Sequence, residues 1–67
     1  MIRNDQELQV TQERIAKFQE QIARLRQVET SAANFHASSS GFLSEIDRMQ
    51  LDVREYLSHL PSELVTT

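Results

Sequence analysis

The sequence predicts an all-α protein, an antiparallel hairpin of two long helices. Three observations support this fold class. One glycine and one proline occur in 67 residues, so little interrupts a helix. In two separate segments, apolar side chains recur in alternating steps of three and four residues, the spacing of one helix face. No stretch alternates apolar and polar residues as a half-buried strand would.

The first helix is expected over residues 5–28. Asn4 or Asp5 can cap its N-terminus, because a side-chain oxygen at that position accepts a hydrogen bond from a free backbone N–H. The apolar steps that follow form a heptad seam, in which the a and d positions face a partner helix. The a positions are Leu8, Ile15 and Ile22, and the d positions are Thr11, Phe18 and Leu25.

The second helix is expected over residues 33–60, with a broader apolar stripe. Pro61 lacks a backbone N–H and disfavours helix at Leu60, so the helix should end there and residues 61–67 should be a frayed tail. Leu43 and Leu57 widen the stripe at e positions, as in a helix that touches more than one neighbour. The remaining seam positions are Phe35, Phe42, Ile46, Met49, Val53, Tyr56 and Leu60.

The joint between the helices contains the stretch "VETSAANFHASSSGF". When the heptad of the second helix is continued backwards from Phe42, Phe35 falls at a d position on the same apolar face. Gly41 costs only about 1 kcal/mol inside a helix. We therefore expect the helix to run through the serines. The joint then shrinks to residues 29–32, with Thr30 or Ser31 as N-cap, a length that joins antiparallel helices. The alternative is a flexible SSSG linker.

Residues 1–67 are expected to form a single helical-hairpin domain. Two helices share one seam, so half of each apolar stripe would stay in water. The simplest solution is a homodimer that forms a four-helix bundle, and the alternative is a helix or groove of another protein. The residues expected in the oligomer seam are Leu8, Ile15, Phe18, Ile22, Leu25, Phe35, Phe42, Leu43, Ile46, Met49, Val53, Tyr56, Leu57 and Leu60.

A second candidate surface lies on the outer side of the second helix. Leu51 takes an f position and points away from the seam. Single exposed leucines are common in proteins. With Arg48 and Arg54 beside it, however, Leu51 can mark a face for a protein partner.

The sequence contains no recognisable catalytic constellation, so we expect neither an enzyme nor a cofactor. There is no cysteine, and His36 and His59 have no neighbour at a metal-ligand spacing. One glycine cannot make a phosphate-binding loop. Glu45 and Asp52 lie seven residues apart and face the same way, which leaves a carboxylate metal-binding bundle as an alternative. The Glu-x-x-His motif of di-metal bundles is absent.

The charge distribution argues against direct nucleic-acid binding. Residues 1–28 carry five basic and four acidic side chains, whereas residues 29–67 carry two basic and six acidic ones, and the net charge is −3. A DNA-binding surface usually has a dense basic footprint. An accessory DNA-associated regulator remains an alternative function. The apolar runs are far shorter than the roughly 20 residues of a membrane helix, and the lack of cysteine suits the cytoplasm.

The opening "MIRNDQELQVTQERIAKFQEQIARLR" resembles the N-terminal helix of small bacterial proteins related to XRE/HigA-like antitoxins. The resemblance is carried by Arg3-Asn4, Thr11, the step from Ile15 to Phe18, and Leu25-Arg26. The segment "GFLSEIDRMQLDVREYLSHLPSE" is similar to short stand-alone proteins of the same kind, common in cyanobacteria and other bacteria.

The resemblance implies a role in a toxin–antitoxin or transcription-regulator module, in which a helical hairpin assembles dimers or contacts a toxin-like partner. The longer relatives carry a DNA-binding helix-turn-helix after this region. Residues 1–67 contain no second compact helix pair with a glycine turn. The resemblance therefore assigns no base-contacting or catalytic residue here.

Overall fold

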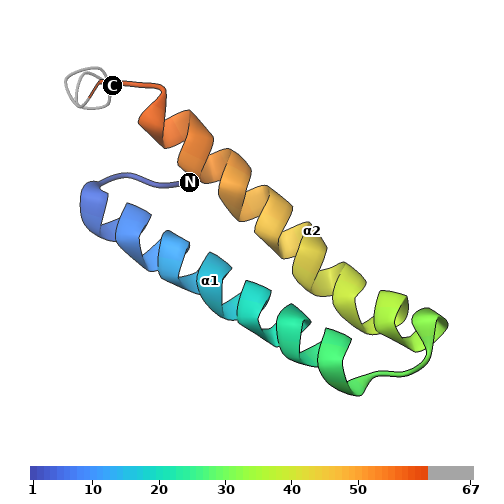
Figure 1. The fold of residues 1–67 in the computed structure, drawn as a ribbon. Coiled ribbons are helices and arrows are strands. Elements are labelled where there is room, and N and C mark those ends of the chain that lie inside the picture. Colours follow the sequence, from blue (N-terminus) through green and yellow to red (C-terminus); the bar gives the residue numbers. More distant parts are fainter. Residues whose placement is uncertain (61–67) are drawn as a thin grey trace.

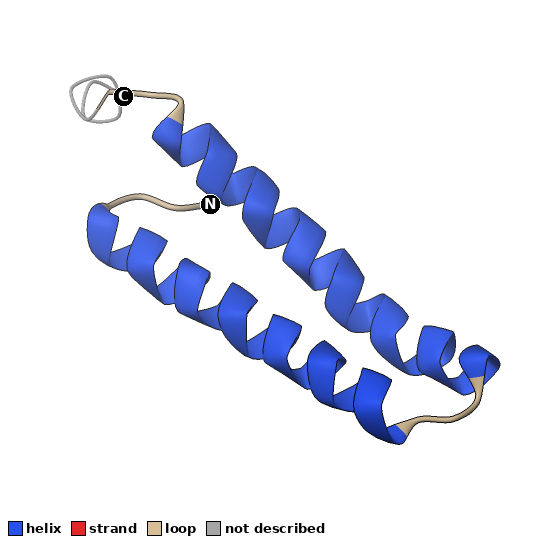
Figure 2. Ribbon diagram, in the orientation of Figure 1, coloured by secondary structure: helices blue, strands red, loops and turns tan. Residues whose placement is uncertain are grey.

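The computed structural model describes residues 1–60 and shows two long helices lying side by side in opposite directions (Figure 1). Helix α1 spans Asp5–Val28 and helix α2 spans Ala32–Leu57. The described residues contain no strand, and short non-helical segments precede, join and follow the helices (Figure 2). The predicted all-α hairpin is confirmed.

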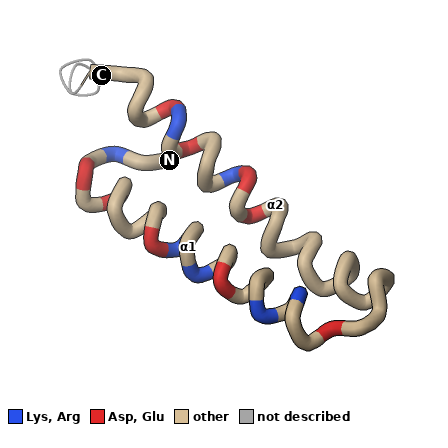
Figure 3. The backbone as a smooth tube through the Cα atoms, in the orientation of Figure 1, with Lys and Arg blue, Asp and Glu red and all other residues tan. Residues whose placement is uncertain are grey.

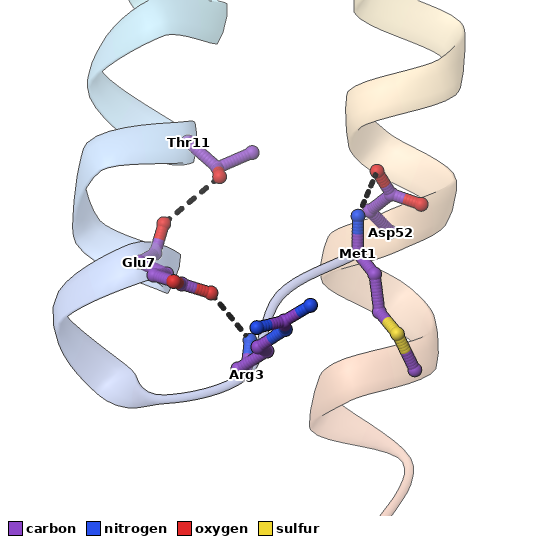
Figure 4. Close-up of polar contacts among 5 residues, drawn as sticks. All are labelled: Met1, Arg3, Glu7, Thr11 and Asp52. Atoms are coloured by element: carbon purple, nitrogen blue, oxygen red, sulfur yellow. Dashed lines mark hydrogen bonds and ion pairs between the residues drawn. The ribbon is translucent and has the colours of Figure 1, made fainter.

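Helix α1 begins at a cap with two side-chain hydrogen bonds. The Asn4 side-chain oxygen accepts a hydrogen bond from the Glu7 backbone N–H at 2.8 Å. In return, the Glu7 carboxylate accepts from the Arg3 backbone N–H at 2.8 Å, close to the reciprocal pattern of a capping box (Figure 4). Asp5 and Glu7 also place negative charge at the positive end of the helix dipole.

The joint between the helices is short and ordered by its own side chains. The Ser31 hydroxyl caps α2 by accepting a hydrogen bond from the Asn34 backbone N–H at 3.3 Å. The Glu29 carboxylate accepts from the Ser31 backbone N–H at 3.0 Å. The serines at 38–40 and Gly41 are helical, as expected, and the alternative of an SSSG linker is wrong.

Helix α2 ends earlier than the sequence predicted, at Leu57 rather than residue 60. The Ser58 backbone N–H still donates to the Arg54 carbonyl at 3.0 Å, but the His59 N–H donates to the Tyr56 carbonyl, a tighter turn. Pro61 disfavours helix at the residue before it, Leu60, and so limits how far α2 can extend. The expected tail of residues 61–67 lies outside the described residues.

The antiparallel register is visible in two contacts far apart along the hairpin. The rings of Phe18 and Phe42 meet across the seam with centroids 5.5 Å apart and planes tilted by 53°. At the open end, the Tyr56 hydroxyl donates a 2.6 Å hydrogen bond to the Asp5 carboxylate. Between these contacts α2 contributes the buried side chain of Met49 and, next to the aromatic pair, that of Ile46.

The segment before α1 folds back onto α2 and adds a third element to the core. Ile2 is buried, with 7% of its surface exposed, a position that the heptad analysis did not include. The Met1 amino group lies 3.6 Å from the Asp52 carboxylate on α2 (Figure 4). An apolar residue shortly before a helix cap is the feature of the sequence that could have pointed to Ile2, although such residues usually pack against the start of their own helix.

Gly41 offers a direct test of the helical assignment. It lies inside α2 without positive φ, and a methyl group added there meets no atom within 4 Å. We expect Gly41→Ala to raise the free energy of unfolding by about 0.5–1 kcal/mol, because alanine loses less backbone entropy in a helix. Urea unfolding followed by circular dichroism measures this gain. A destabilised variant would contradict a regular helix at this position.

Candidate interaction surface

The predicted seam residues of α1 lie between the two helices but are not enclosed. All six positions are half-buried, and every other residue of α1 is exposed. The periodicity therefore coincides with the least exposed face of α1, and the oligomer seam itself stays a prediction. The six side chains, each open on one side, are Leu8, Thr11, Ile15, Phe18, Ile22 and Leu25.

The predicted seam residues of α2 divide into two groups. Ile46 and Met49 are buried, and Phe35, Phe42, Val53 and Tyr56 are half-buried. The three remaining leucines are exposed: 46% for Leu43, 62% for Leu57 and 65% for Leu60, which lies beyond the helix end. The hairpin therefore covers the a and d positions of α2 but leaves its widened stripe in water.

Ser39 is the most deeply buried side chain of the described residues, with 1% of its surface exposed. Its hydroxyl oxygen has no hydrogen-bond partner. It occupies an a position in the helix half that faces the C-terminal half of α1. A small residue here lets the two backbones approach closely, while the unpaired hydroxyl costs free energy.

The heptad positions g and e lie on opposite sides of the seam and form two flanks, which differ in the structure. The g flank consists of Glu7, Arg14, Gln21, Val28, Ser38, Glu45 and Asp52. The e flank consists of Asp5, Gln12, Gln19, Arg26, His36, Leu43, Gln50 and Leu57. Glu7, Arg14 and Asp52 line one hollow together with Met1 and Ile2, so the N-terminal segment lies against the open-end part of the g flank.

The e flank is not covered by the N-terminal segment. At the loop end of the hairpin, Arg26 of α1 and His36 of α2 line a second hollow, beside the half-buried ring of Phe35. The edge of the His36 ring meets Phe35 with centroids 5.6 Å apart. All eight residues of the e flank are exposed. Two of them carry formal charge, against four of the seven residues on the g flank.

Charge is also absent from the first part of α2. Residues 30–44 contain no lysine, arginine, aspartate or glutamate. Figure 3 shows this uncharged half of α2 lying along the part of α1 where acidic and basic residues alternate. Solvent-facing helices usually carry charges throughout, so an uncharged half indicates a surface suited to packing.

The other predicted surface, formed by Arg48, Leu51 and Arg54, is exposed on α2. Leu51 is 54% exposed and lies on the side of the helix that faces away from α1. The two arginines flank it on the same helix, and both are exposed. Whether a protein partner binds there remains a prediction.

The contact between Tyr56 and Asp5 is the polar link across the open end of the hairpin. The hydrogen bond to the Asp5 carboxylate raises the pKa of the Tyr56 phenol above its ordinary value of 10.0, since ionisation would break the bond. Partial burial and the negative charges of Asp5 and Glu7 act in the same direction. Spacing alone does not predict this pair, because Asp5 and Tyr56 lie 51 residues apart in the sequence.

Two further observations concern residues 1–60. No group of three or more histidine, aspartate or glutamate side chains lies close enough together to hold a metal ion in this range. Neither α1 nor α2 combines the length and the apolar character that crossing a bilayer requires.

Comparison with protein-family models, with curated protein sequences and with solved structures finds no match to this chain. The similarity to XRE/HigA-like antitoxins therefore remains an expectation from the residues that carry it.

We expect Ser39→Ala to stabilise the hairpin by about 1–2 kcal/mol. The change removes a buried hydroxyl that has no partner, keeps a small side chain at the close approach, and improves helix propensity. Thermal and urea unfolding at one protein concentration measure the gain. Ser40→Ala is the matched control, because Ser40 is exposed and its hydroxyl donates to the Ala37 carbonyl. An equal gain in both variants would contradict the argument from burial.

The Tyr56 phenol should lose its proton at a higher pH in the folded protein than in the unfolded chain. A raised folded-state pKa stabilises the fold fully below pH 10 and loses this contribution as pH rises through the folded pKa. Tyr56 is the single tyrosine, so absorbance of the tyrosinate reports it directly. Asp5→Asn should shift the pKa back towards 10. An unchanged titration in that variant would contradict the assigned cause.

Proposed function

We propose that this chain is a non-enzymatic oligomerisation and partner-binding module, which dimerises through its helices into a four-helix bundle. The carrying observation is that the hairpin does not bury its own apolar stripe. Among the apolar residues described, Ile2, Ile46 and Met49 are buried, whereas the α1 seam remains half open and Leu43 and Leu57 are exposed.

The small core supports the proposal. A chain of this size rarely gains more than about 3–5 kcal/mol from one core. Burying the half-open α1 seam together with Leu43 and Leu57 would therefore add substantially to stability.

A place in a toxin–antitoxin or regulator module is part of the proposal. It is supported by the resemblance carried by Arg3-Asn4, Thr11 and the step from Ile15 to Phe18. In this proposal the seam and its flanks assemble the dimer, and Arg48, Leu51 and Arg54 remain available to a toxin-like protein. The lack of cysteine fits action in a reducing cytoplasm.

The decisive experiment is sedimentation equilibrium of the purified chain, with helicity followed by circular dichroism through a dilution series. A helical dimer that loses helix only when it dissociates would support the proposal. A chain that stays monomeric and helical at all concentrations would contradict the dimer, and the search would move to a different protein partner.

Ile46→Asp should abolish both association and helix. Ile46 is 5% exposed, and an unpaired carboxylate at such a site costs several kcal/mol, comparable with the whole stability of a small domain. Leu51→Asp is the control, because Leu51 is exposed on the same helix and the same charge there stays in water. An Ile46→Asp protein that remains helical and dimeric would rule out this seam.

A further inference from the structure

We propose that the e flank is the dimer face and that its occupant is the e flank of a second copy of this chain. This inference rests on the proposed dimer and goes further by choosing one of the two sides of the hairpin. The g flank is less suited to a second hairpin, because the N-terminal segment already occupies its open-end part and four of its seven residues are charged. Ile2 is buried there, and Met1 is paired with Asp52.

Two exposed leucines of α2 fall on the e flank, whereas the g flank carries one exposed apolar side chain, Val28. Leu43 and Leu57 lie fourteen residues apart on the same side of α2, with Gln50 midway between them. On α1 the corresponding positions are Gln12 and Gln19. Leucine and glutamine can all be buried against another helix, glutamine through hydrogen bonds, without a charge being removed from water.

The charges of the e flank suit a second copy better than a strongly charged partner. Asp5 and Arg26 carry its two formal charges, at opposite ends of α1, and Asp5 is already hydrogen-bonded by Tyr56. The central part carries none. Two identical faces brought together therefore bury no like charges against each other at their centre, which a symmetric interface requires.

The size of the face also fits. A helix of 24 residues is about 36 Å long, and two adjacent helices of about 10 Å diameter present roughly 700 Å² on one side. This is close to the area that each partner contributes to a standard interface. The half-open seam residues Ile15 and Ile22 would become enclosed when a second hairpin closes over this side.

The test compares leucine-to-glutamate changes of similar exposure on different sides of α2. Leu43→Glu combined with Leu57→Glu places charge on the e flank, and Leu51→Glu places it on the outer side. In a two-fold symmetric dimer each substitution occurs in both protomers, so two copies of it lie in the interface. The double variant should therefore raise the dimer dissociation constant at least about 100-fold, while Leu51→Glu should leave it within about threefold.

Sedimentation equilibrium of the three proteins separates the outcomes. If Leu51→Glu dissociates the dimer and the double variant does not, the dimer stands but this face is wrong. If the unmodified chain is monomeric at every concentration, the proposed dimer itself fails. Equal association in all three proteins also overturns the e flank as the interface.

A labelling measurement tests the same face without placing a charge in it. The chain has no cysteine, so Gln19→Cys, Gln50→Cys and Leu51→Cys each give a single site for a nitroxide spin label. Distances between labels in the dimer should be shorter for Gln19→Cys and Gln50→Cys than for Leu51→Cys. The reverse order would place the interface on the outer side of α2 and overturn the proposal.

Discussion

Two helices touch along a single line, and this geometric limit governs the rest of the structure. A side chain on that line is covered by the opposite helix but stays open towards both flanks. Every seam position of α1 is half-buried for this reason. Four side chains of the described residues are buried: Ile2 and Met49, where the N-terminal segment contributes a third group, and Ser39 and Ile46 on the seam of α2.

The same limit explains how much could be predicted from the sequence. The heptad spacing identified both helices and the contact positions of α1, because periodicity records which side of a helix meets another. The caps at Asn4 and Ser31 followed from side-chain chemistry. The position of Phe35 in the heptad of the second helix correctly predicted that residues 38–40 are helical.

Other features depend on contacts between residues far apart in the chain, which periodicity does not encode. Ile2 lies outside both heptad runs, yet it is buried because the first four residues turn back onto α2. The hydrogen bond from Tyr56 to Asp5 joins residues 51 positions apart. Which flank stays bare could not be inferred either, since it depends on where the N-terminal segment lies.

Because the joint is only three residues long, a second topology is geometrically possible. If residues 29–31 became helical, α1 and α2 would merge into one rod of about 80 Å. Two such rods lying antiparallel could remake the seam between chains, which is a domain-swapped dimer. The Ser31 cap and the Glu29 carboxylate hold the turn instead. These two hydrogen bonds are therefore the side-chain contacts in the joint that favour the hairpin over a swapped rod.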